Sequence, residues 1–215
     1  MKMNRIIYVL AALALVATSC DKFLDVMPDN RTELDTPEKI RSFITSAYPE
    51  TDYMLITEFS SDNVDDYGAN NPNHDRFIDQ VFRWEEITES DNEDVENLWG
   101  NSYIAIAAAN QAIEAINDMG GAEAAGLEAE MAEALLCRAY SHFILVNVFA
   151  QAYAGETAAK DLGITYMLQP EQGLNPKYDR NTVAEVYDFI DKDLQAALPY
   201  VSEQYYTVPK YHFNL

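Results

Sequence analysis

Residues 132–150 read AEALLCRAYSHFILVNVFA, and apolar side chains recur on almost every face of the helix that this spacing predicts. A helix that is apolar nearly all round is buried on several sides, so other elements must pack around it. We expect this helix to run from about Glu123 to Phe149. Cys137 lies in its middle, where a cysteine behaves as a small buried hydrophobe rather than as a disulfide partner.

Two amphipathic helices are predicted on either side of this central one. Residues 90–121 begin with a capping box of Ser90 and Glu93 and end at a Gly-Gly pair. Residues 182–199 begin with a second capping box and end at a proline. Small residues recur at the expected contact points: Ala105, Ala107, Ala108, Ala109, Ala132, Ala134 and Ala139. This pattern favours paired antiparallel helices packed as in tetratricopeptide repeats, although no clean 34-residue repeat accompanies it.

A shorter helix and a long polar region precede these three helices. The stretch 36–49 has Thr36 as a predicted N-cap, a proline at the first helical position and another proline that ends the helix. Residues 50–90 lack a sustained period and are rich in Asp, Asn, Gly and Pro, which predicts a long surface loop. Short extended pieces are expected at 53–59 and 77–84. Long loops of this kind often carry function.

The amino terminus has the layout of a bacterial lipoprotein signal. A short positive start precedes the apolar run Ile6–Ala17, which is too short to cross a bilayer but fits a signal peptide. We expect residues 1–19 to be removed, Cys20 to receive the lipid, and residues 20–35 to form a tether. The alternative is an ordinary secretory peptide that is cut near Ser19 and leaves a free thiol.

The composition excludes several classes of partner. The chain has 36 acidic and 14 basic residues, a formal net charge of −22. Binding to nucleic acid is excluded because neutralising phosphates needs a basic face. Electrostatic adhesion to anionic lipid is also disfavoured. With two cysteines, one at each of the places described above, no disulfide framework is expected.

Several motifs, taken in order, resemble the amino-terminal half of the SusD/RagB family of outer-membrane nutrient-binding lipoproteins of Bacteroidetes. They are SCDKFLDVMP, LWGNSYIAIAAANQAI, AEALLCRAYSHFILVNVFA, DLGITYML and RNTVAEVYDFIDKDLQAAL. The matching residues are Cys20, Leu24, Asp25, Trp99, Tyr103, Ile106, Ala109, Asn110, Ala132, Glu133, Arg138, Ala139, Tyr140, Arg180, Thr182, Val183, Glu185, Val186, Tyr187, Ile190, Asp193 and Leu194. Ala150 departs from the family, which usually has a glycine there.

The resemblance implies a mostly α fold, in which tetratricopeptide-like helical pairs form an α-solenoid scaffold with long irregular loops. Residues 36–215 would be the amino-terminal helical domain of a SusD-like protein, truncated at the carboxy end and of low stability alone. The implied role is to bind glycans or oligosaccharides at the cell surface, held to the outer membrane by the lipid anchor. The implied partner is a SusC-like TonB-dependent transporter, which would receive the ligand.

The polar loop at 60–84 is the best candidate for ligand contact. Sugar binding uses flat aromatic faces together with short polar groups that pair with hydroxyls. The candidate ligand-binding residues are Asp66, Tyr67, Asn70, Asn71, Arg83 and Trp84. The alternative for each is that Trp84 packs and the polar residues merely solvate the loop. Trp99 is predicted to be core. Arg138 and Arg180 are predicted to be structural, as a partner of helix acids and as support for the helix start at Thr182.

No catalytic constellation, metal-ligand spacing or cofactor motif is detectable. Adjacent carboxylates such as Asp65–Asp66 are most often solvated surface in a chain this acidic, and His142 is interpreted as a helix residue with its hydrogen bonds satisfied. We therefore expect a non-enzymatic protein without cofactor or metal. Three classes of function stay open. The first is a glycan-binding lipoprotein, and the second is a binder of peptides or other nutrients, or a tetratricopeptide-type interaction protein. The third is a glycoside hydrolase, which needs two carboxylates across a cleft.

Overall fold

The computed structural model describes residues 33–72, 75–89, 95–171, 173 and 176–201. All the elements named below lie in the second of two units of the chain, Leu34–Leu215. The described residues are mostly helical, and their only β-type pairing is an isolated bridge between Leu162 and Thr182. The predicted signal peptide, Cys20 and the capping box at Ser90 and Glu93 lie outside the described residues.

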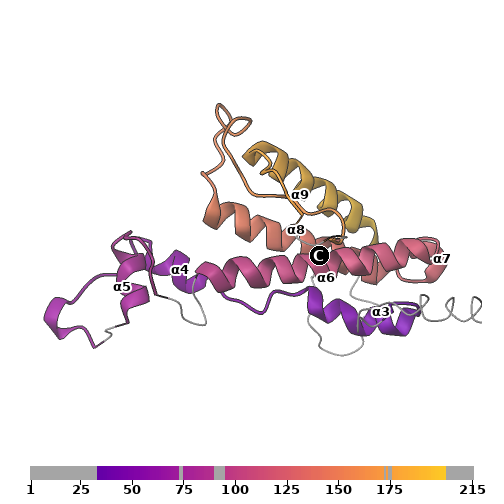
Figure 1. Cartoon of the computed structure of the whole chain (residues 1–215), viewed down its shortest axis with the longest axis horizontal. Helices are drawn as coiled ribbons and strands as arrows, with labels where there is room; N and C mark the ends of the chain where they lie inside the picture. Colours follow the sequence, from indigo (N-terminus) through magenta and orange to yellow (C-terminus); the bar gives the residue numbers. More distant parts are fainter. Residues whose placement is uncertain (1–32, 73–74, 90–94, 172, 174–175, 202–215) are drawn as a thin grey trace, which may run out of the picture. The chain divides into compact units, whose positions relative to one another are not determined.

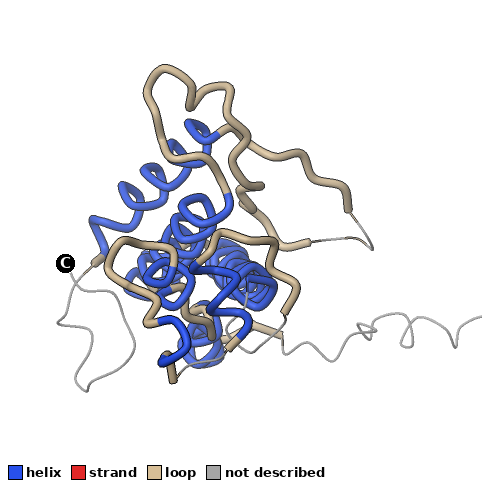
Figure 2. The backbone as a smooth tube through the Cα atoms, turned by 90° about the vertical axis from the view of Figure 1, so that its left-hand side faces the viewer, coloured by secondary structure: helices blue, strands red, loops and turns tan. Residues whose placement is uncertain are grey.

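Three long helices form the scaffold: α6 (Val95–Asp118), α8 (Glu128–Phe149) and α9 (Val183–Ala197). They pack in sequence, α6 on α8 and α8 on α9, and run in alternating directions (Figure 1). Figure 2 shows the same helices from a viewpoint close to the axis of α6, with α9 crossing obliquely. On the other side of α6 lie α3 (Pro37–Phe43) and the 3₁₀ turn Ile44–Ala47. The prediction that other helices pack around the central helix is therefore confirmed, because α8 lies between α6 and α9.

The sequence-predicted caps explain where α3 and α9 begin. Thr36 accepts a hydrogen bond from the Lys39 backbone at 3.4 Å, with proline at the first helical turn. Thr182 and Glu185 form the reciprocal capping box, at 3.3 and 2.8 Å. The backbone hydrogen bond to Thr182 lowers the pKa of Glu185, as expected for a carboxylate at the positive end of a helix.

The predicted helix from Glu123 to Phe149 is wrong at its start. A separate turn of helix, α7 (Ala122–Ala125), comes first, and Gly126 then adopts a left-handed conformation with φ +64°. The Leu127 backbone N–H returns to the Ala122 carbonyl at 2.9 Å, which closes α7 before α8 begins. Gly126 supplies a conformation that other residues adopt only with strain, so the break follows from one glycine.

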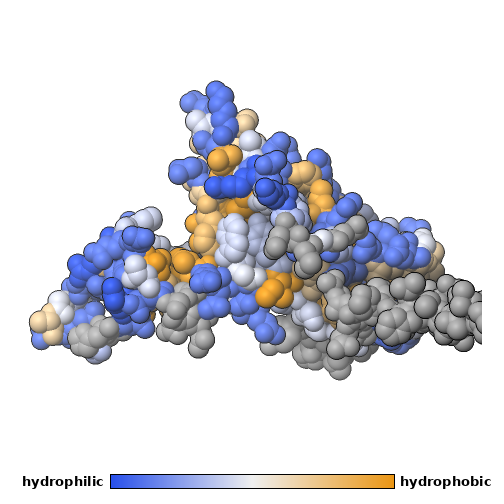
Figure 3. All heavy atoms as spheres, in the orientation of Figure 1, coloured by the Kyte–Doolittle hydropathy of each residue, from blue (hydrophilic) through white to orange (hydrophobic). Residues whose placement is uncertain are grey.

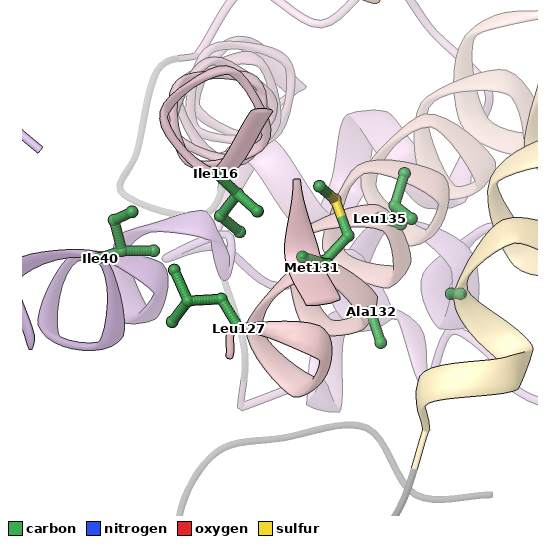
Figure 4. Close-up of a cluster of buried hydrophobic side chains, with 8 residues drawn as sticks. Ile40, Ile116, Leu127, Met131, Ala132 and Leu135 are labelled. Carbon is green, nitrogen blue, oxygen red and sulfur yellow. The ribbon is translucent and has the colours of Figure 1, made fainter. Parts of the chain in front are cut away.

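Two apolar clusters hold the scaffold together. At one end Ile40, Ile116 and Leu127 point toward one another, from α3, α6 and the start of α8 (Figure 4). Near the other end, Ile106, Val146 and Val186 join α6, α8 and α9. Cys137 is buried between α6 and α8 as predicted, and burial raises the pKa of its thiol, so the thiol stays protonated.

The predicted extended pieces at 53–59 and 77–84 are wrong. These residues form helices α4 (Met54–Phe59) and α5 (Arg76–Phe82). Phe77 and Val81 are four residues apart, so they share one helical face and pack with Ile56 against Leu98 and Ile144 of the scaffold. Burial of this i, i+4 pair favours a helix where the short apolar run alone was ambiguous.

Candidate functional site

A cavity of about 810 Å³ opens between α4, the loop that follows it, and α5. It is lined by Phe59, Asn63, Val64, Asp65, Asp66, Tyr67, Gly68, Asn71, Pro72, Asp75, Arg76, Ile78, Asp79, Phe82 and Arg83. This volume is within the usual range for small-molecule sites. The lining mixes aromatic and aliphatic groups with carboxylates, amides and two guanidinium groups.

Local hydrogen bonds fix both walls of this cavity. On one side, Asp75 caps α5 by accepting from the Phe77 and Ile78 backbones at 2.9 and 3.3 Å. On the other side, Asp66 accepts from the Gly68 backbone at 2.8 Å, and Gly68 takes a left-handed φ of +62° to make the turn. The loop is thus shaped by its Asp and Gly residues, as the sequence composition indicated.

Arg83 joins the two walls. Its Nε donates to Asp79 at 2.7 Å within α5, and its Nη2 lies 3.1 Å from Asp66 in the loop. The hydrogen bond to Asp79 raises the pKa of the Arg83 guanidinium above its ordinary value. Because these groups are largely exposed, the pairing contributes more to the shape of the cavity than to stability.

The structure brings together four of the six candidate residues. Asp66, Tyr67, Asn71 and Arg83 all line the same cavity. Tyr67 is 77% exposed, so its ring is accessible to a ligand. Asn70, in the 3₁₀ turn Gly68–Asn70, is not among the lining residues, nor is Trp84.

Trp84 has an unusual backbone. It lies just past α5 with φ +54°, and the Glu85 N–H returns to the Gln80 carbonyl at 2.9 Å while the Trp84 N–H bonds to Val81 at 3.2 Å. This is the Schellman ending of a helix, in which the left-handed position is normally a glycine. Trp84 is 79% exposed, so no burial offsets this strain.

A second cavity, of about 420 Å³, lies between α6 and a set of residues from the segment that connects α8 to α9: Thr165, Met167, Gln169, Glu171 and Tyr178. Trp99 and Tyr103 line it from the helix. The expectation that Trp99 is core is wrong: the ring contacts Tyr103 and Phe149 but is 41% exposed. Trp99 and Tyr103 lie four residues apart, a spacing that could have indicated a shared aromatic face.

A buried polar network fixes the segment that forms this second cavity. Arg138 of α8 makes two 2.7 Å bonds to Asp193 of α9 and one of 2.8 Å to Asn110 of α6. Asn110 in turn donates to the Met167 carbonyl at 3.0 Å, and Tyr166 donates to Asp193. The predicted structural role of Arg138 as partner of a helix acid is confirmed.

His142 belongs to the same network and is satisfied, as predicted. Its Nε2 accepts from the Met167 backbone at 3.0 Å, so its Nδ1 carries the proton and donates to the Arg138 carbonyl at 2.8 Å. Burial lowers the pKa of His142 to about 3, which keeps the ring neutral. A ring with both nitrogens engaged and no exposed surface is placed for structure rather than for proton transfer to a ligand.

Arg180 also holds backbone, at the approach to α9. Its guanidinium donates to the Gly163 and Leu162 carbonyls, the latter at 3.1 Å. This ties the connecting segment to the chain that precedes the cap at Thr182, in line with the predicted support of the helix start. Tyr103 donates to the Thr165 carbonyl at 2.9 Å, and burial raises its pKa to about 12.

In the described part of the chain, no group of three or more His, Cys, Asp or Glu side chains is arranged to hold a metal ion. Nor does any helix there have the length and hydrophobicity to span a membrane.

Three solved structures share the fold of this chain. They are SusD superfamily proteins from Bacteroides thetaiotaomicron VPI-5482, Bacteroides fragilis and Bacteroides vulgatus ATCC 8482, with TM-scores of 0.60, 0.59 and 0.56 and identities of 20%, 22% and 22%. The matches cover 78%, 74% and 78% of this chain but 38% of each of those chains.

The chain thus spans less than half the length of the structures that it matches, and corresponds to an amino-terminal portion of them. No match was found among curated proteins. Residues 22–215 match the profile of a SusD-like family described as "Starch-binding associating with outer membrane". With its mostly helical scaffold and this match over nearly its whole length, the chain belongs to the SusD-like family.

Proposed function

We propose that the protein binds an oligosaccharide without turning it over, in the cavity between α4 and α5. The observation that carries this proposal is the exposed Tyr67 ring at a cavity that is also lined by four carboxylates, two amides and two guanidinium groups. A ring face can stack on a sugar, and the polar groups can pair with its hydroxyls. Membership of a family described as starch-binding supports the same class of ligand.

The site favours binding over hydrolysis. Asp66 and Asp79 both line the cavity, but each is an ion-pair partner of Arg83, at 3.1 and 2.7 Å. A glycosidase needs two carboxylates that face the scissile bond across a cleft, whereas both of these carboxylates are held by hydrogen bonds from the same guanidinium. The pairing therefore gives these two aspartates the role of holding Arg83 rather than that of acid and base.

The test is to titrate the protein, in its full natural length, with a panel of polysaccharides by isothermal calorimetry. Tyr67→Ala is expected to weaken binding by about thirtyfold, roughly 2 kcal/mol, if the ring is a binding hot spot. Trp84 does not line the cavity but is exposed just beyond Arg83, where a longer glycan could reach it, so Trp84→Ala is expected to weaken binding less than Tyr67→Ala does and to leave the protein folded. Tyr153→Ala is the matched control, because Tyr153 is an exposed tyrosine that packs on Tyr187, away from the cavity.

The outcomes separate the alternatives. Unchanged affinity in folded Tyr67→Ala and Trp84→Ala would remove this loop from the site. A loss with Trp99→Ala instead would move the ligand to the second cavity. Release of shorter sugars from the glycan by the purified protein would favour a hydrolase, and binding of peptides alone would favour the peptide-binding alternative.

We also propose that the protein is lipidated at Cys20, lies at the cell surface on the outer membrane, and passes its ligand to a SusC-like TonB-dependent transporter. The motive is the short apolar run that ends in small residues before Cys20, together with a family described as associating with the outer membrane. Cys20→Ala is expected to release the protein from membranes or leave it unprocessed. Partition of the wild-type mature protein into the aqueous phase of a detergent separation would disprove the anchor.

The transporter partnership has its own test. Mild detergent extraction and affinity purification of the protein from its native membranes should recover a TonB-dependent transporter in stoichiometric amount. Recovery of the protein alone, under conditions that preserve other outer-membrane complexes, would contradict the partnership while leaving glycan binding intact.

A further inference from the structure

We infer that the cavity between α4 and α5 selects uncharged glycans and rejects polyanionic ones, those that carry carboxylates or sulfates. This inference rests on the proposed function and adds the class of sugar to it. It is carried by the sign of the charges around the cavity and by the partners of its two arginines.

The cavity wall is acidic. Four aspartates line it, against two arginines, so the lining carries a net charge of two negative units: Asp65, Asp66, Asp75, Asp79, Arg76 and Arg83. The excess extends beyond the wall, because residues 51–89 contain ten Asp and Glu residues, two Arg and no Lys. The surface over α5 in Figure 3 is correspondingly hydrophilic.

Both arginines are already engaged with carboxylates. Arg83 pairs with Asp79 and Asp66 at 2.7 and 3.1 Å, and Arg76 pairs with Glu89 at 2.8 Å. Recognition of a ligand carboxylate or sulfate uses an arginine fork that is open to it. An anionic sugar would have to displace a carboxylate that the fold itself holds beside the guanidinium.

The same wall suits hydroxyl groups. A carboxylate has about four lone-pair positions, and at Asp65 the described contact is one hydrogen bond, from the Asp66 backbone at 2.8 Å. Sugar hydroxyls can donate to the remaining positions, whereas a sugar carboxylate has no proton to donate. The groups that bind a neutral sugar are thus the ones that repel an anionic one.

Long-range electrostatics act in the same direction. The chain carries a formal net charge of −22, and the excess of negative charge in the cavity lining adds to the field of the whole protein at the cavity mouth. A polyanion is therefore repelled during approach as well as in the cavity. This repulsion extends over about 30 Å at 0.01 M salt and about 3 Å at 1 M, so salt separates it from steric exclusion.

The test begins with two panels titrated against the protein in its full natural length. The neutral panel contains amylopectin, dextran, mixed-linkage β-glucan, xyloglucan and galactomannan, and the anionic panel contains polygalacturonate, alginate and chondroitin sulfate. Binding within the neutral panel alone is expected. Binding confined to the anionic panel would overturn this inference and leave the proposed function standing, whereas binding of no glycan in either panel would overturn the proposed function itself.

The neutral glycan that binds best is then compared with its carboxymethyl and hydroxyethyl derivatives at equal, low substitution. The two derivatives are similar in size and differ in charge. The carboxymethyl form is expected to bind at least about tenfold more weakly than the hydroxyethyl form at 0.01 M salt, with the gap closing toward 1 M. Equal affinities at low salt would overturn the inference.

A charge-removing variant assigns the repulsion to this cavity. Asp65→Asn keeps an acceptor for the Asp66 backbone, and it should raise affinity for the carboxymethyl form about twofold at low salt, the effect of one charge roughly 8 Å away in water. Affinity for the hydroxyethyl form should fall or stay level but not rise, because the Asn oxygen offers sugar hydroxyls fewer lone pairs than the carboxylate does, so the ratio of the two affinities is the readout. Asp188→Asn on α9 removes the same charge from an exposed site outside the cavity, and an equal gain there would attribute the repulsion to net charge alone and contradict the inference.

Discussion

The scaffold of α6, α8 and α9 and the region of α4 and α5 use polar side chains in opposite ways. In the scaffold, Arg138 and Asp193 lie between helices with side chains 7% exposed, and each bonds to further members of the network. Around α5, the polar groups surround an open cavity, and Gln80 is the one buried polar residue among those described between 51 and 89.

This difference separates structural from ligand-binding chemistry. A buried polar group without a partner is costly, so the network fixes the positions of three helices and of the segment 163–169. Exposed polar groups carry no such constraint and are available to a ligand. The α4–α5 region is therefore attached to the scaffold through one apolar cluster, around Phe77 and Val81, while its polar groups shape and line the cavity.

The largest expected effect is in the scaffold. Asp193→Ala leaves the Arg138 guanidinium buried without its carboxylate, and removal of one partner from such a pair costs about 3–5 kcal/mol of unfolding free energy. Urea unfolding should show this as a lower midpoint. Asp188→Ala, an exposed aspartate on the same helix, should stay within about 0.5 kcal/mol of the wild type. Similar losses in the two variants would show that the buried pair has no special role.

A smaller effect concerns the dependence of stability on pH. The pKa of His142 is lowered to about 3 in the folded protein, against 6.5 as its ordinary value. Between pH 6.5 and pH 3 the imidazole of His142 is protonated in the unfolded chain but neutral in the folded one. The folded state is therefore at its full stability, as far as this group is concerned, above pH 6.5, and loses stability as the pH falls toward 3. The slope from this group is at most about 1.4 kcal/mol per pH unit.

The difference between wild type and His142→Gln isolates this contribution from that of the many carboxylates. Unfolding free energy measured at several pH values between 6.5 and 4 should fall less steeply in the variant. Parallel curves would mean that the histidine is not held neutral by the scaffold, and would weaken the contrast between the two regions.

The smallest effect is at the exposed end of α5. Trp84→Gly places glycine, the preferred residue, at a left-handed position, which relieves roughly 1–2 kcal/mol of backbone strain in the folded state. The greater conformational freedom of glycine in the unfolded chain offsets part of this gain. Unfolding free energy should rise by up to about 1 kcal/mol while glycan affinity falls. A clear loss of stability would mean that Trp84 packs, the alternative considered from the sequence. Trp99→Gly, within α6, should destabilise.

Helix caps could be predicted from the sequence, whereas the structure of short apolar runs and the burial of single side chains could not. Thr36, Thr182 and Glu185 gave helix starts because a cap and its target are three residues apart. Reasoning failed at 53–59 and 77–84, where a short apolar run is compatible with strand or helix until its buried face is known. It failed also at Trp99, because position on a helix stripe does not say whether a neighbour covers that side chain.

The sequence alone determined that the protein is mostly helical, roughly where α6 and α9 end, and where α3 and α9 begin. These features follow from contacts between residues a few positions apart. The sequence did not show that α3 ends at Phe43 and continues as the 3₁₀ turn Ile44–Ala47. The tertiary structure decided which distant groups meet: Arg138 with Asp193, which are 55 residues apart, and Asp66 with Arg83, which are 17 apart. Such pairs depend on how helices pack, which no local pattern encodes, so both the buried network and the cavity with its paired arginines became visible only in the folded chain.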